Sequence, residues 1–164
     1  MWYYMPYYSP DEVYMNYELL CSQLYSLIGG VPHRIANLAN AAALLFNTLE
    51  KINWAGFYFI ENGVLVLGPF QGKHACIEIP LGRGVCGTAA EKNETVTVKN
   101  VHDFPGHIAC DSASASEIVI PLRQNGKVIG VLDIDSPVLN RFSESDRQGL
   151  EKFAEILEEE LFNK

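Results

Sequence analysis

The chain has 164 residues, a length that fits one ordinary domain with an apolar core of its own. Nearly half of the residues (48%) are hydrophobic and a fifth (20%) are charged, which is typical of a globular protein. The formal net charge of −8 argues against a nucleic acid or an anionic membrane as the main partner, because both are bound by basic surfaces. We therefore expect a single domain over residues 1–164, with no role assigned to residues 1–10.

The sequence also carries information about the compartment. No apolar run approaches the length of a membrane span, and the start "MWYYMPYY" lacks the basic and then apolar order of a secretory signal. These features predict a cytoplasmic protein. Thiols are kept reduced there, and a disulfide is usually transient and either catalytic or redox-sensing. Each of the four cysteines therefore needs its own interpretation.

Helices are predicted where apolar residues recur at steps of three and four. They are expected at about 11–28, 33–50 and 143–162. The apolar stripe of the first helix includes Cys21, and that of the second includes Ile35. Ser143 and Asp146 form a capping pattern at the start of the last helix. The stripes of the first and last helices are wide enough for two subunits to pair.

Strands are predicted between the second and the last helix. They are expected at about 54–70, 75–80, 94–100 and 117–135. An Asn-Gly pair interrupts the first and the last of these runs, which predicts two hairpins. A glycine turn opens a short helix at about 82–93. The order favours an α+β fold, in which a mostly antiparallel central sheet carries the N- and C-terminal helices on one face and loops roof a pocket on the other.

The cysteines lie in four different local settings. Cys21, on a helical apolar stripe, fits a small core residue. Cys76 begins a predicted strand and, taken alone, fits a buried strand residue. Cys86 follows a glycine turn at a helix start, where the helix dipole lowers a thiol pKa, but a small residue packed in the first turn fits equally well. Cys110, in a loop of small polar residues, is either a reactive accessible thiol or an incidental one.

The spacing of cysteines and histidines does not suggest a metal site. Cys76, Cys86 and Cys110 are separated by ten and twenty-four residues, whereas structural zinc sites usually pair ligands two to four residues apart. His74 and Cys76 form one close pair, which is a weak signal. We therefore expect no metal.

Three acidic residues gather at one end of the second predicted hairpin. Asp133 and Asp135 are two residues apart and face the same side of a strand, and Glu117 begins the partner strand. Counting outward from the turn at Asn125 places all three at the far end. Carboxylates held together suit a cationic ligand group, a metal, or an acid whose pKa is raised so that it donates a proton. Asp135 alone also fits a turn residue before Ser136.

The motifs "NWAGFY", "QGKHACIEIPLGRGVCGTAA", "VHDFPGHIACDSASASEIVIPL" and "GVLDIDSP" occur in this order. Together they resemble the free methionine-(R)-sulfoxide reductases, an enzymatic branch of the GAF domains. The resemblance extends roughly from Tyr17 to the end of the chain. It implies a GAF-like fold and a thiol-dependent oxidoreductase that reduces free methionine (R)-sulfoxide to methionine without a cofactor.

The resemblance also implies roles for individual residues. Cys110 would be the nucleophile, Cys76 the resolving thiol and Cys86 a further redox partner or an alternate. The substrate-binding residues would be Glu117, Asp133 and Asp135, with Trp54 and Tyr58 as an aromatic wall.

Attack on the sulfoxide would leave a sulfenic acid, which a second cysteine converts to a disulfide for thioredoxin to reopen. Either Asp135 or Glu117 would supply the proton. A homodimer is expected from the family. The alternative is a GAF module that binds a small ligand or senses oxidants without catalysis.

Overall fold

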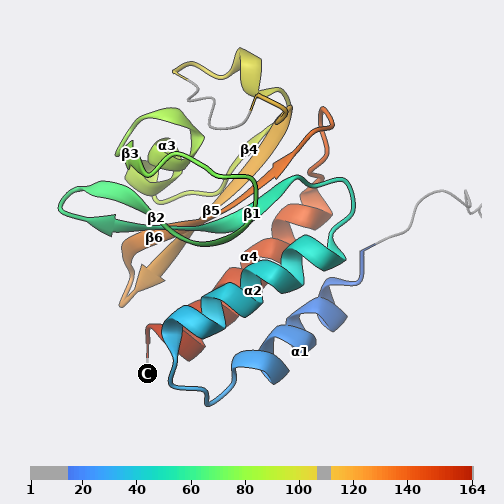
Figure 1. Ribbon diagram of the computed structural model, residues 1–164, viewed down its shortest axis with the longest axis vertical. Coiled ribbons are helices and arrows are strands. Elements are labelled where there is room, and N and C mark those ends of the chain that lie inside the picture. Colours follow the sequence, from blue (N-terminus) through green and yellow to red (C-terminus); the bar gives the residue numbers. More distant parts are fainter. Residues whose placement is uncertain (1–14, 107–111, 164) are drawn as a thin grey trace, which may run out of the picture.

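The computed structural model describes residues 15–106 and 112–163 (Figure 1). Cys110 and residues 1–10, on which several expectations fall, lie outside these residues. The helices are α1 (Tyr17–Ile28), α2 (Arg34–Thr48), α3 (Gly84–Lys92) and α4 (Glu144–Leu161), with a short 3-10 helix at Val101–Asp103. The strands are β1 (Trp54–Glu61), β2 (Val64–Gly72), β3 (Glu78–Pro80), β4 (Val96–Val98), β5 (Ser116–Gln124) and β6 (Lys127–Ser136).

The strands form one antiparallel six-stranded sheet in the order β3-β2-β1-β6-β5-β4. The two predicted hairpins, β1–β2 and β5–β6, lie next to each other through the pairing of β1 with β6. Their turns are Asn62-Gly63 and Asn125-Gly126, and all four residues have positive φ angles, as the tight turn of a two-residue hairpin requires. Both hairpin predictions are confirmed, and so is the α+β class.

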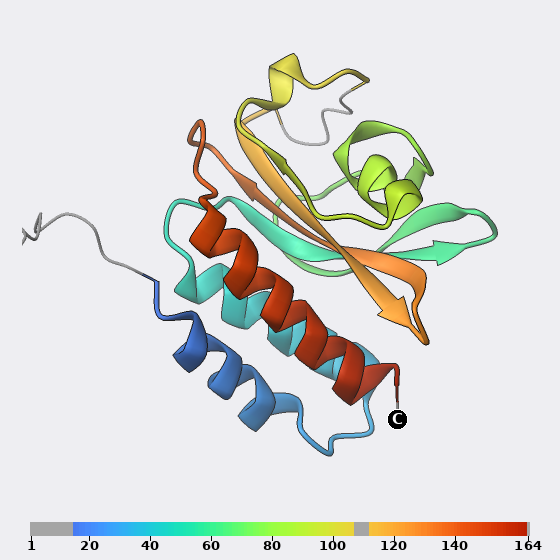
Figure 2. The ribbon, with the colours of Figure 1, turned by 180° about the vertical axis from the view of Figure 1, so that it is seen from behind.

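Helices α1, α2 and α4 lie on one side of the sheet and α3 lies on the other (Figures 1 and 2). The side chains of β1, β5 and β6 alternate between the two sides, so that Phe57, Ile118 and Leu132 pack under the three long helices. Tyr58, Val119 and Val131 pack against α3 in a second apolar cluster. The long connections and α3 therefore cover the second face, as expected.

The start of α4 confirms the predicted capping pattern. The Ser143 hydroxyl accepts a hydrogen bond from the Asp146 backbone N–H, and the Asp146 carboxylate accepts one from the Ser143 backbone N–H. The Tyr17 hydroxyl also donates to Asp146 at 2.6 Å, which ties α1 to the start of α4. These hydrogen bonds fix the start of α4 and hold it against α1.

Three local expectations are wrong. Ile35 is 76% exposed, because α2 turns a different edge of its stripe toward the sheet. Cys76 does not begin a strand, since β3 starts two residues later at Glu78. The apolar stripes of α1 and α4 are not available for pairing between subunits, because both are buried in the chain's own core. The buried residues are Cys21, Leu24 and Ile28 on α1 and Leu150, Phe153 and Leu157 on α4.

Within the described residues, none of the helices combines the length and the apolar character that crossing a bilayer requires.

Candidate active site

Strand register brings the three predicted acids to one place. Glu117 on β5 lies opposite Asp135 on β6, and Asp133 lies one alternation further along the same face. Their neighbours Ile118 and Ile134 point into the core under the long helices, so the carboxyl groups point to the side covered by α3. Glu117 and Asp133 are each only 6% exposed, whereas Asp135 is half-buried. Burial within the acidic group therefore increases from Asp135 to Asp133.

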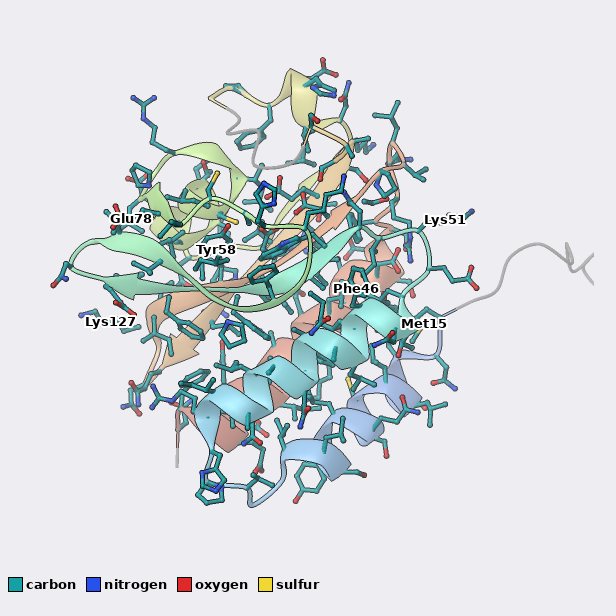
Figure 3. The ribbon with its side chains drawn as sticks, in the orientation of Figure 1. Met15, Phe46, Lys51, Tyr58, Glu78 and Lys127 are labelled. Carbon is teal, nitrogen blue, oxygen red and sulfur yellow. The ribbon has the colours of Figure 1, made fainter. Side chains whose placement is uncertain are left out.

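The two predicted aromatic residues stand beside these acids on the neighbouring strand. Trp54 pairs with Asp135, and Gly56 pairs with Asp133. Tyr58 follows on the same face, on the α3 side of the sheet (Figure 3). The Trp54 ring stacks on Tyr58 with centroids 5.9 Å apart. The predicted acids and aromatics thus form one continuous wall.

Phe70 is a member of this wall that sequence reasoning missed. Its ring stacks on Trp54 with centroids 5.3 Å apart and planes 15° from parallel. Gly56 allows this approach, since a Cβ there would lie 2.3 Å from the Phe70 Cβ. Gly56 and Phe70 are paired across β1 and β2, next to a register shift between Gly56 and Tyr58. The apolar pattern of the sequence does not show which residues of the two strands are paired.

The aromatic wall also holds the connection that carries Cys76. The Trp54 indole N–H donates to the backbone carbonyl of Lys73 at 3.1 Å, and the Tyr58 hydroxyl donates to that of Cys76 at 3.1 Å. Cys76 is disulfide-bonded, whereas Cys21 and Cys86 carry free thiols. The structure therefore ties the segment that carries the disulfide-bonded Cys76 to the aromatic wall beside the acidic group.

Cys86 lies in the first turn of α3, close to the acids. Its Sγ is 3.9 Å from Glu117 Oε1, and only 3% of the residue is exposed. Burial, followed by the charges of Asp133 and Glu117, raises the pKa of the Cys86 thiol well above its usual value. The expectation that the helix start lowers this pKa is wrong, because desolvation and two carboxyl groups outweigh the helix dipole.

The buried acids are strongly perturbed as well. Burial, then the charges of Asp133 and Asp135, raises the pKa of Glu117 well above its usual value. Burial raises the pKa of Asp133 to about 6, while its hydrogen bonds with Cys86 and Glu117 oppose the rise. Both buried acids therefore keep their protons to a higher pH than an exposed carboxyl group does.

Asp133 should make the stability of the protein depend on pH. A raised folded-state pKa means that the stabilising effect is complete below the unfolded value of 3.8 and is lost as pH rises through about 6. We expect the free energy of unfolding to fall by about 1–2 kcal/mol more in the wild type than in Asp133→Asn between about pH 5 and about pH 8. Urea unfolding at both pH values measures this difference.

The matched control is Glu61→Gln, which removes an exposed carboxylate at the first hairpin turn. It should retain the wild-type pH dependence. Parallel pH profiles for the wild type and Asp133→Asn would contradict the assignment of the raised pKa to Asp133.

Comparisons with known proteins agree with this geometry. A family model described as "GAF domain" matches residues 36–159. The free methionine-R-sulfoxide reductase of Escherichia coli (strain K12) is 55% identical over 136 residues, which cover 83% of this chain and 82% of that protein. This chain belongs to the free methionine-R-sulfoxide reductase family.

Two further relatives support the family assignment. Protein YtsP of Bacillus subtilis (strain 168) is 57% identical over 148 residues, covering 89% of this chain and 91% of that protein. The solved structure described as fRMsr of Staphylococcus aureus, in complex with substrate, has a TM-score of 0.86 and 51% identity, and the match covers 90% of this chain and 96% of that chain. The reductase family and its GAF fold are thus shown over most of the chain.

Proposed function

We propose that this protein reduces free methionine (R)-sulfoxide to methionine, with Cys110 as the nucleophile and Cys76 as the resolving thiol. The observation that carries the proposal is the acidic group of Glu117, Asp133 and Asp135. It lies beside the aromatic wall, whose Tyr58 hydroxyl donates a hydrogen bond to the backbone carbonyl of Cys76. A family relative named for this activity supports the choice of substrate. The six-stranded sheet supports one domain over the described residues.

The acidic face suits a free amino acid. The ammonium group of methionine sulfoxide needs anionic partners, and half-buried Asp135 and buried Asp133 supply them. The methyl group needs an apolar surface, for which Trp54 beside Asp135 is well placed. The sulfoxide then lies between the acids and the connection that carries Cys76.

Glu117 is the proton donor in this scheme. The sequence left Glu117 and Asp135 as alternatives. The raised pKa of Glu117 favours Glu117, because it keeps this acid protonated to a higher pH than an exposed carboxyl group. Donation to the sulfoxide oxygen makes the sulfur electrophilic. Asp135 is half-buried and remains a binding group.

The thiol chemistry then balances in three steps. Attack of Cys110 on the protonated sulfoxide transfers the oxygen, releases methionine and leaves a sulfenic acid. The Cys76 thiol attacks the sulfenic acid, which forms a disulfide and releases water. An external dithiol, for which we propose thioredoxin, reduces that disulfide by exchange. The disulfide-bonded state of Cys76 and the free thiols of Cys21 and Cys86 support this pairing.

Cys86 acts in this scheme as a hydrogen-bond donor and not as a nucleophile. Its raised pKa leaves little thiolate, and thiolate is the form that attacks sulfur. Its thiol instead donates a hydrogen bond to Glu117 at 3.9 Å. Cys86 therefore acts on the acidic group, and Cys76 resolves the sulfenic acid first.

We also propose a homodimer formed through α1. Leu19, Tyr25 and Leu27 on this helix are 55%, 58% and 44% exposed, which is a large apolar surface for one short helix. These residues lie beside the buried stripe of α1, so the helix can pack on its own core and still present an apolar surface to a partner.

Peptide-bound methionine sulfoxide should be a poor substrate. An amide in place of the ammonium group would leave Asp133 desolvated and unpaired, which lowers kcat/KM by roughly 10²-fold or more. Rates on free methionine sulfoxide and on an N-acetylated, amidated derivative of the same diastereomer measure this. Equal values of kcat/KM on the two would contradict the proposed role of the acids.

The alternative function is a GAF module that senses oxidants or binds a ligand without turnover. The buried proton donor favours the enzyme, because a sensor thiol needs no acid held beside it.

A further inference from the structure

Three side chains from three different elements converge beneath α3. Cys86 comes from α3, Glu117 from β5 and Asp133 from β6, and one possible ligand atom from each lies within 4.8 Å of the others. All three residues are buried, with exposed fractions of 3%, 6% and 6%. The set is therefore a fixed cluster inside the protein and not a chance group of surface charges.

One buried oxygen of this cluster has no hydrogen-bond partner within the part of the chain that the structure describes, although buried polar atoms normally have one. Asp133 Oδ1 is fully buried and has no hydrogen-bond partner among the described residues. Such an acceptor costs free energy unless a donor or a cation meets it. Asp133 Oδ1 is therefore available to a donor or a cation that enters the cluster.

The donor atoms favour one class of cation. A thiolate with two carboxylates suits a borderline-soft divalent ion such as Zn²⁺ or Cd²⁺, whereas Ca²⁺ and Mg²⁺ prefer all-oxygen sites. Around a tetrahedral zinc ion with bonds of about 2.0–2.3 Å, ligand atoms lie roughly 3.5 Å apart. The 3.9 Å between Cys86 Sγ and Glu117 Oε1 needs only a small contraction to match.

The cluster would not fill the coordination shell of a tetrahedral ion. Three protein ligands leave a fourth position free, as in zinc sites that bind an exchangeable ligand. Half-buried Asp135, on the same face of β6, adds negative charge near the cluster, which favours a cation there. A metal was one of the ligands that the three acids suited in the sequence, but the spacing of cysteines and histidines argued against it. Here the possible ligands come from three separate elements, so their spacing in the chain is long.

We propose that Cys86, Glu117 and Asp133 bind a divalent cation of the zinc class, and that the bound cation excludes substrate from the pocket. The second half rests on the proposed function, since the same carboxylates are there assigned to the substrate ammonium group. The first half does not depend on it. Zinc-class ions then act as inhibitors that compete with methionine sulfoxide.

The cation site is tested on protein with the Cys76 disulfide intact, in which Cys86 and Cys21 are free thiols. Titration with Cd²⁺ should produce one thiolate-to-metal charge-transfer band with a stoichiometry of one ion per chain. Cys86→Ala should abolish the band, and the matched control Cys21→Ala should retain it. Absence of the band in the wild type, its persistence in Cys86→Ala or its loss in Cys21→Ala would each overturn the site.

Glu117→Gln tests the carboxylate ligands and should weaken Cd²⁺ binding at least 10-fold, with the fold checked by circular dichroism. If circular dichroism showed that Glu117→Gln does not fold, Glu117→Asp would replace it, because this variant keeps the carboxylate but shortens its reach toward the ion. Unchanged affinity in the folded variant would exclude Glu117 as a ligand and overturn the proposed set.

Competition is measured in the same disulfide-bonded protein, which does not turn over. Free methionine (R)-sulfoxide, added while a metal buffer holds free Cd²⁺ constant, should reduce the charge-transfer band in proportion to its occupancy. An undiminished band at saturating sulfoxide would overturn the exclusion of substrate. Since this band reports cation binding without catalysis, failure of the cation site and failure of the reductase activity give different results.

Discussion

Replacing Cys110 with serine should abolish methionine formation, even in a single turnover with excess enzyme. A serine hydroxyl at neutral pH is far less nucleophilic than a thiolate and cannot accept the sulfoxide oxygen to form a sulfenic acid. We expect no methionine above background when the reduced variant is incubated with free methionine (R)-sulfoxide and quenched over time. Chromatography of the quenched mixture measures the product.

Two further variants make this result specific. Cys21→Ser removes a thiol on α1 that lies outside the site, and it should leave the single-turnover rate unchanged. Cys76→Ser should produce one equivalent of methionine and then stop under thioredoxin, because the sulfenic acid has no resolving thiol. Methionine production by Cys110→Ser, or full cycling by Cys76→Ser, would contradict the assigned roles.

Replacing Glu117 with glutamine should slow the single-turnover rate by roughly 10²- to 10⁴-fold. The amide keeps the size of the side chain but cannot release a proton to the sulfoxide oxygen. Glu117 has a raised pKa, so the protonated acid is present below that pKa and is lost as pH rises through it. The wild-type rate should therefore fall on the alkaline side, once the thiol ionisation is accounted for, and the variant should lack this fall.

The control for Glu117→Gln is again Glu61→Gln, an exposed carboxylate far from the acidic group. Its rate and pH profile should match those of the wild type. A rate for Glu117→Gln within a few-fold of the wild type would exclude Glu117 as the proton donor and return the role to Asp135.

The acidic group could be predicted from the sequence because β-hairpins are local structures. An Asn-Gly turn fixes which residues face each other, and the two-residue period fixes the side. Counting outward from Asn125 placed Glu117 near Asp133 and Asp135, and the observed register confirms this. The capping pattern of Ser143 and Asp146 could be predicted for the same reason, since it involves only four consecutive residues.

Features that depend on contacts between distant elements could not be predicted. The pKa of Cys86 is set by burial against β5 and β6, which no helix-start argument includes. The stacking of Phe70 on Trp54 depends on the register of β1 and β2. Ile35 fitted the helical stripe, but packing of α2 against the sheet selected a different edge and left it exposed. Cys76 lies ahead of β3 because the pairing of β3 with β2 begins only at Glu78, opposite Val66.

The central claim is that a reduced thiol pair converts one diastereomer of free methionine sulfoxide to methionine. The most direct measurement is to incubate reduced protein separately with the (R) and (S) forms and to count thiols and methionine before and after. The account predicts that the (R) form yields one methionine and removes two thiols per chain, while the (S) form does neither. No thiol loss with either form, or equal loss with both, would contradict it.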